Sequence, residues 1–217
     1  METRHQVHNL IILDESGSMQ SIKTSIIQGF NEVVQTIKGI ELQYPEQEHS
    51  ITFVSFNGLG QKVHHFMDKA SMLQQIDDKS YQPDASTPLY DAMGFSMNKL
   101  KHALQDQTDY HVLVTILTDG EENASREFSG NDIKKMVDDL KLNNWTFTYI
   151  GADHDVERIA FSLSITNTLV FEKNEADIKT MFEKDRNART NYSRKIRDKE
   201  DTSSRYFDEE PNRKDQV

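Results

Sequence analysis

The chain has no cysteine among its 217 residues, and no apolar segment opens it. The lack of cysteine excludes disulfide bonds and thiolate metal ligands, and it is typical of proteins in a reducing compartment. Residues 1–8 are polar and charged, so the sequence predicts neither a signal peptide nor a membrane span. We therefore expect a cytoplasmic protein with no membrane partner.

An excess of positive charge is also lacking. The formal net charge is −11 at pH 7. Residues 1–171 contain 24 acidic side chains against 13 lysines and arginines, whereas residues 172–217 contain 12 of each. An acidic folded part repels a phosphate backbone, so we expect no nucleic-acid partner. A divalent cation or a basic protein surface suits this charge better.

Apolar residues follow strand and helix periods in alternation along the chain. Apolar segments predict six strands, at residues 7–13, 51–56, 62–66, 112–117, 145–150 and 168–171. Spacings of three and four predict helices at residues 19–39, 70–76, 89–104, 132–142, 155–163 and 175–187. This order predicts an α/β fold: a doubly wound, mostly parallel six-stranded sheet with one antiparallel edge strand and helices on both faces. We expect one domain over residues 5–190, followed by a polar C-terminal tail over residues 191–217 that is disordered or frayed.

A short run of oxygen donors directly follows the first predicted strand. Asp14, Ser16 and Ser18 form a D-x-S-x-S pattern at the end of the strand where open α/β sheets bind ligands. Thr87 precedes a predicted helix, and Asp119 comes immediately after the strand at 112–117. Carboxylate and hydroxyl oxygens suit a hard divalent cation. We therefore predict that three distant segments supply one metal site at this edge of the sheet.

Each segment taken alone also fits an ordinary structural role. Asp14, Ser16 and Ser18 would suit a helix N-terminus, and Thr87 before a proline would suit an N-cap. Asp119 followed by glycine would suit a simple turn. All three segments in the right order, each after the expected element, favour the metal site.

Four further residues are expected beside the ion. Gly17 and Gly120 would let the backbone turn tightly there. Asp91 either orients the site threonine or is a helix-start acid favoured by the helix dipole. Glu121, with Glu122, either forms the rim of the site or belongs to a solvated acidic loop.

With these residues the chain resembles a von Willebrand factor type A (vWA) domain that carries a metal-ion-dependent adhesion site. The D-x-S-x-S run, the separate threonine and the later aspartate all match, and the similarity covers about residues 5–190. Residues 86–92 (STPLYDA) and 118–125 (TDGEENAS) are most similar to small stand-alone bacterial members. The resemblance implies a Rossmann-like fold and direct coordination of the ion by Ser16 and Ser18. It implies that Asp14 acts through hydrogen bonds and water, and that Thr87 and Asp119 exchange direct and water-mediated roles.

The chemistry of such a site predicts its use. With few direct carboxylates, Mg²⁺ or Mn²⁺ is short of negative charge, and Mg²⁺ keeps waters in its unfilled positions. An Asp or Glu of a partner protein can displace one of these waters. We therefore predict a divalent-cation-dependent protein-binding module that is not an enzyme.

Two alternatives stay open. In the first, the chain is a scaffold with a purely structural metal, and its partners dock elsewhere. In the second, it is a metal-dependent phosphohydrolase. The second is disfavoured because Ser16 stands where a D-x-D site would place its acid/base, and because Glu15 is expected to point away from Asp14.

Overall fold

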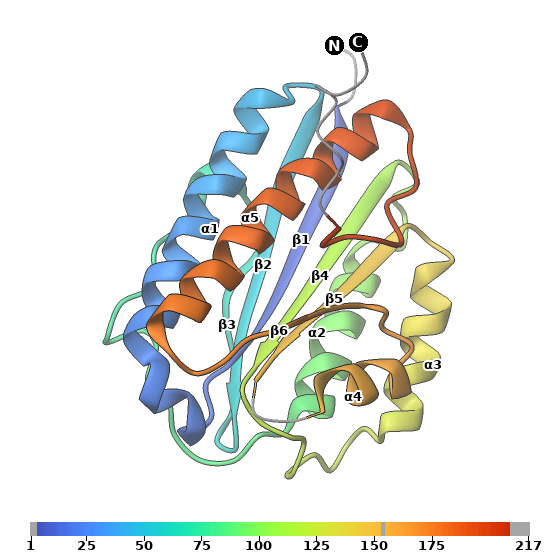
Figure 1. Cartoon of the computed structure of the whole chain (residues 1–217). Coiled ribbons are helices and arrows are strands. Elements are labelled where there is room, and N and C mark those ends of the chain that lie inside the picture. Colours follow the sequence, from blue (N-terminus) through green and yellow to red (C-terminus); the bar gives the residue numbers. More distant parts are fainter. Residues whose placement is uncertain (1–3, 153–154, 209–217) are drawn as a thin grey trace.

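The structure, a computed structural model, describes residues 4–152 and 155–208. Six strands form one sheet in the order β3-β2-β1-β4-β5-β6 (Figure 1). Neighbouring strands are parallel except β2 and β3, which are antiparallel. The strands are β1 (His5–Asp14), β2 (Gln47–Asn57), β3 (Gly60–Lys69), β4 (Tyr110–Thr118), β5 (Trp145–Gly151) and β6 (Asn167–Val170). The predicted α/β fold with one antiparallel edge strand is confirmed.

Helices cover both faces of the sheet (Figure 1). One face carries α1 (Lys23–Gln43) and α5 (Glu175–Asp198); the other carries α2 (Leu89–Ala103), α3 (Gly130–Lys141) and α4 (Val156–Ser162). Two short 3-10 helices are η1 (Gly17–Ile22) and η2 (Ala70–Met72). Leu10 and Ile12 of β1 pack with α2 and α3, whereas Ile11 and Leu13 pack with α1 and α5, because successive side chains of a strand point to opposite faces. Burial on both faces explains the almost continuous apolar run Val7–Leu13 in β1.

The helices predicted at residues 19–39 and 70–76 differ in extent from the observed ones. The first begins as the 3-10 helix η1 and becomes α-helical only at Lys23. Helix α1 continues past Gly39 to Gln43, because Ile40 is buried and an interior glycine costs a helix only about 1 kcal/mol. The segment predicted as a helix at 70–76 forms only the single turn η2. Beyond it, the backbone N–H and C=O of Ile76 bond to the Asn31 side chain instead of to a helix.

The packed structure continues past residue 190, where we predicted the end of the domain. Helix α5 continues to Asp198 instead of ending at residue 187. Tyr192 and Tyr206 are buried against Val7 and Leu113, so the chain up to residue 208 is part of the packed domain. Two aromatic rings supply enough buried apolar area to anchor a segment that is otherwise polar. Residues 209–217 of the predicted tail lie outside the described residues.

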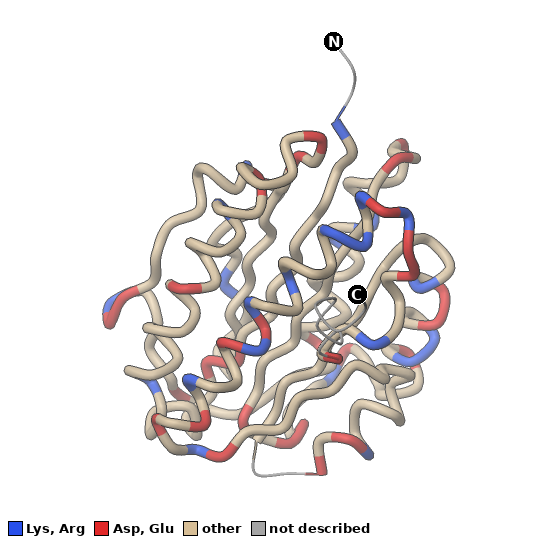
Figure 2. Tube along the Cα trace, turned by 45° about the horizontal axis from the view of Figure 1, so that its top comes forward, with Lys and Arg blue, Asp and Glu red and all other residues tan. Residues whose placement is uncertain are grey.

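A buried ion pair also ties α5 to the sheet. Arg189 and Asp185 are each 2% exposed and pair across one helical turn, and Arg189 donates a second hydrogen bond to Thr115 of β4. Figure 2 shows the basic residues of α5 interleaved with acidic ones. The charge-rich composition of this region therefore conceals a helix with a buried face. None of the described helices is long and apolar enough to cross a membrane.

Candidate metal centre

Strand β1 ends at Asp14, whose carboxylate is held from two sides. Its Oδ1 accepts a hydrogen bond from the Ser16 N–H (2.7 Å), and its Oδ2 accepts one from the Thr118 hydroxyl at the end of β4 (2.6 Å). The Tyr81 hydroxyl donates to the Asp14 carbonyl oxygen (2.7 Å). Burial raises the pKa of Asp14 to about 6, although the hydrogen bonds from Thr118 and Ser16 act in the opposite sense. A cation bound nearby would favour the ionised carboxylate.

The three predicted segments meet at the carboxyl edge of the sheet. The hydroxyl oxygens of Ser16 and Ser18 lie 3.1 Å apart, and Ser18 donates to Asp119 Oδ1 (2.5 Å). Gly120 lines the space between these groups and Thr87: a Cβ at position 120 would lie 3.6 Å from both the Ser18 and the Thr87 hydroxyl oxygens. The structure thus brings together the predicted ligands Asp14, Ser16, Ser18, Thr87 and Asp119. That they bind a metal stays a prediction.

The donor set fits a hard divalent cation, because its hydroxyl and carboxylate oxygens are the ligands that Mg²⁺ prefers. Ser18 is exposed, whereas the other four predicted ligands are buried, so the cluster reaches solvent at Ser18. None of the described residues donates a hydrogen bond to the buried Oδ2 of Asp119. A buried oxygen of this kind requires a partner, and a cation would supply one. In the structure the ammonium of Lys173 lies 2.8 Å from it.

The two glycines of the site have ordinary backbone conformations. Among the described glycines only Gly60 has a positive φ, so the backbone freedom that we expected of Gly17 and Gly120 is not used. A Cβ on Gly17 would approach the Ala85 carbonyl oxygen to 3.4 Å, where the Gly17 N–H donates a hydrogen bond. The first loop therefore lies directly against the loop that leads to Thr87.

Asp91 shapes the loop that follows Asp119. Its carboxylate accepts hydrogen bonds from the backbone N–H groups of residues 126, 127 and 128, at 2.8–2.9 Å. The described contacts of Thr87 are with Asn123: the Thr87 N–H donates to Asn123 Oδ1 (2.9 Å), and the Asn123 N–H donates to the Thr87 carbonyl (3.2 Å). Asn123, which sequence reasoning missed, therefore positions the threonine.

The two glutamates after Gly120 differ. Glu121 is exposed, in keeping with a place at the rim. Glu122 instead accepts hydrogen bonds from the backbone N–H groups of Tyr90, Ala124 and Ser125. Glu122 joins the start of α2 to this loop, so it is not simply part of a solvated acidic loop. The contacts with Ala124 and Ser125 are local, whereas the contact with Tyr90 joins two segments that the sequence does not show to be neighbours.

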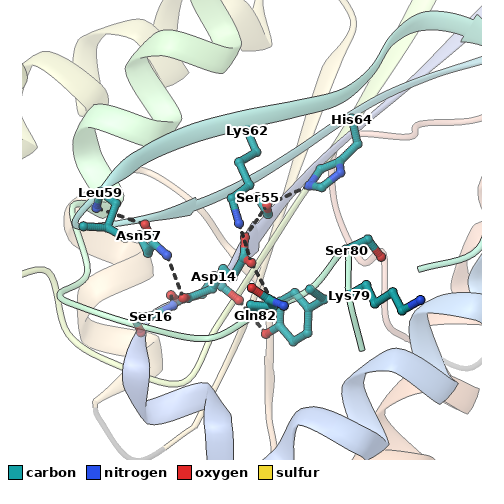
Figure 3. A network of polar contacts seen from close by, with 12 residues as sticks. Asp14, Ser16, Ser55, Asn57, Leu59, Lys62, His64, Lys79, Ser80 and Gln82 are labelled. Carbon is teal, nitrogen blue, oxygen red and sulfur yellow. Dashed lines mark hydrogen bonds and ion pairs between the residues drawn. The ribbon is translucent and has the colours of Figure 1, made fainter. Parts of the chain in front are cut away.

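Glu15 was also missed as a site residue. It is fully buried, and its carboxylate accepts hydrogen bonds from the Ser55 hydroxyl (2.7 Å) and the Gln82 N–H (2.6 Å). Lys62 of β3 pairs with it at 2.8 Å, and His64 extends the network through Ser55 (Figure 3). These contacts join the first loop to β2, β3 and the loop before α2. An acid at the end of a buried strand requires such partners, which is the signal that would have indicated it.

Comparison with known proteins decides the family. A sequence model of the von Willebrand factor type A domain matches residues 10–184. The chain belongs to the von Willebrand factor type A family. No curated protein matches this vWA domain at a significant level.

Solved structures agree with the vWA fold. A von Willebrand factor type A protein from Catenulispora acidiphila aligns with 88% of this chain at 16% identity and a TM-score of 0.57; the chain spans 43% of that protein. The vWF domain of the type V pili tip protein Mfa5 from Porphyromonas gingivalis aligns at 11% identity and a TM-score of 0.55, covering 93% of this chain and 98% of its own. The pilus adhesin SpaC from Lactobacillus rhamnosus GG aligns at 12% identity and a TM-score of 0.60, covering 88% of this chain and 30% of its own. At these identities the likeness concerns the fold alone.

Proposed function

We propose that this vWA domain is a divalent-cation-dependent protein-binding module. In this proposal Mg²⁺ or Mn²⁺, held by Asp14, Ser16, Ser18, Thr87 and Asp119, binds an aspartate or glutamate of a partner protein. The observation that carries it is the cluster of three hydroxyls and two carboxylates around Gly120, open to solvent at Ser18. A role in protein binding is also in keeping with two structural neighbours, which are named as a pilus adhesin and a pili tip protein.

The charge of the cluster supports capture of an outside acid. Hydroxyl ligands are neutral, and both oxygens of Asp14 already accept hydrogen bonds from the protein. A divalent ion in this cluster would retain positive charge and waters at its open positions. The bound ion supplies a Lewis-acidic point of attachment, and the desolvated carboxylate of a partner is a strong charge-assisted ligand for it.

The alternative of a purely structural ion is less well supported. The loops around the cluster are already joined by the protein's own hydrogen bonds, from Thr118 to Asp14, from Gln82 to Glu15 and from Gly17 to Ala85. They do not need an ion to fasten them. A phosphohydrolase is disfavoured because the engaged oxygens of Asp14 are poorly placed to act as a nucleophile, so we propose a role without catalysis. We also propose a cytoplasmic location, supported by the absence of cysteine alone.

Metal binding is tested by calorimetric titration of the whole chain with Mn²⁺ and Mg²⁺. We expect one ion per chain, and loss of binding in Ser18→Ala and Asp119→Ala. Ser96→Ala is the matched control, because the Ser96 hydroxyl is buried without a hydrogen-bond partner in the described structure and lies outside the cluster. Unchanged affinity in Ser18→Ala and Asp119→Ala would refute the proposed site.

Partner capture is tested by affinity purification in Mg²⁺ and in EDTA, with circular dichroism of the same samples. We expect partners that are lost in EDTA and in Asp119→Ala while the folded signal persists. Unfolding in EDTA would indicate a structural ion instead. Partners retained in EDTA would indicate docking elsewhere.

A further inference from the structure

Lys173 places its ammonium group among the proposed metal ligands. It lies on the connection between β6 and α5, and its Nζ is 2.8 Å from Asp119 Oδ2. The Lys173 side chain is 21% exposed and that of Asp119 is 0% exposed, so the ammonium lies at the border between the cluster and solvent. An ion pair between such groups is only weakly screened by solvent.

The segment around Lys173 is fixed at both ends. Phe171 is buried, and its N–H donates to the Gly151 carbonyl oxygen (3.0 Å). Asn174 caps α5 by accepting a hydrogen bond from the Asp177 N–H (2.9 Å). The backbone on either side of Lys173 is therefore held in place, and its ammonium reaches Asp119.

The two oxygens of Asp119 are used differently. Oδ1 accepts the hydrogen bond from Ser18, whereas Oδ2 has the ion pair with Lys173 but no hydrogen bond of good geometry from any described residue. The ammonium therefore balances the charge of the Asp119 carboxylate. A divalent cation on Asp119 would supply more charge to the same carboxylate. Two cations a few ångströms apart in a partly buried site repel each other strongly.

We propose that Lys173 is a built-in competitor of the divalent cation: its ammonium neutralises Asp119 in the metal-free protein and is displaced when the metal binds. This inference rests on the proposed metal site. Two consequences follow. The metal-free protein is stabilised by the ion pair, and the affinity for the metal is lower than the oxygen ligands alone would give. The domain then loads its ion, and binds its partner, only above a raised threshold of free divalent cation.

The test compares Mn²⁺ affinity, by calorimetry and electron paramagnetic resonance, among four lysine variants. Lys173→Met and Lys173→Gln remove the charge and keep the aliphatic stem, and we expect them to bind Mn²⁺ roughly tenfold or more tightly than wild type, as expected for removal of one close charge. Lys173→Arg keeps the charge and should stay close to wild type. Lys179→Met, an exposed lysine on α5, is the matched control and should also stay close to wild type.

A second readout does not involve the metal. Thermal unfolding in EDTA should show a lower midpoint for Lys173→Met and Lys173→Gln than for wild type, because Asp119 loses its cation. Addition of Mn²⁺ should raise the midpoint of these variants more than that of wild type.

The possible failures are distinguishable. If wild type binds Mn²⁺ and Asp119→Ala does not, but Lys173→Met and Lys173→Gln bind as wild type does, the competitor is refuted while the metal site stands. If neither wild type nor the Lys173 variants bind Mn²⁺, the proposed metal site fails, and the competitor with it. Binding in the Lys173 variants alone would support both.

Discussion

Two glycines of α1 provide a sharp test of how α5 packs against α1. A Cβ built on Gly29 would overlap the ring of Phe182 on α5, whereas a Cβ on Gly39 would meet nothing within 4 Å. Both glycines lie inside the same helix. The same substitution to alanine should therefore have opposite effects at the two positions.

The magnitudes follow from two opposing contributions. Replacing an interior helical glycine by alanine stabilises a helix by about 1 kcal/mol. Gly39→Ala should gain most of this, since position 39 is exposed. At Gly29 the new methyl group must displace the buried Phe182 ring, and overpacking of this kind costs about 1–3 kcal/mol. Since the packed ring leaves the methyl group no space, we expect the cost to exceed the gain and Gly29→Ala to be destabilised by about 1–2 kcal/mol.

The assay is urea unfolding, followed by far-ultraviolet circular dichroism and by the fluorescence of Trp145, the one tryptophan of the chain, which is buried. The midpoint should rise for Gly39→Ala and fall for Gly29→Ala. In a Phe182→Leu background, where the ring is absent, Gly29→Ala should change sign and become stabilising. Equal shifts of the same sign at both glycines would refute the packing of α5 against α1 described above.

Three further outcomes are expected, each measured by urea unfolding and the third also by hydrogen exchange. Burial lowers the pKa of His49 to about 4 from its ordinary 6.5, so the unfolded chain takes up a proton at that histidine first as the pH falls. His49 should therefore contribute a loss of about 3 kcal/mol of stability between pH 6.5 and 4, and His49→Gln should reduce the pH dependence by that amount. Arg189→Met should lower the free energy of unfolding by about 3–5 kcal/mol, because it leaves the Asp185 carboxylate buried without its ion-pair partner. Adding Asp185→Leu should recover much of this loss, and an Arg189→Met variant as stable as wild type would contradict the buried pair. Glu15→Gln should lower the free energy of unfolding by about 1–3 kcal/mol and speed hydrogen exchange in the loop of residues 79–85. Unchanged exchange in that loop would mean that Glu15 does not hold it.

Local pattern was sufficient for most of the fold. The apolar run of β1 predicted a strand buried on both faces, and the apolar positions of residues 19–37 predicted helix α1. It failed where a few residues outweigh composition. Tyr192 and Tyr206 hold a polar segment that resembled a disordered tail, and Asn31 replaces the expected helix after η2 by hydrogen bonding to Ile76.

Part of the candidate site could also be predicted from local pattern. Asp14, Ser16 and Ser18 follow a strand, and Asp119 follows another, so a parallel sheet must bring them to one edge. Lys173 gives no such indication, because it is an ordinary lysine in a charge-rich region. It reaches Asp119 only because β6 and α5 direct it there.

By itself, the sequence determined the alternation of strands and helices and the order in which the oxygen donors follow the strands. These properties depend on backbone hydrogen bonding and on the spacing of buried side chains along the chain. Neighbouring residues encode both. Only the tertiary structure decided which distant polar groups meet: Lys173 pairs with Asp119, Glu15 pairs with Lys62, and Arg189 donates a hydrogen bond to Thr115. Such pairs depend on the order of the strands in the sheet and on the position of α5 against it. The spacing of apolar residues along the chain does not specify either.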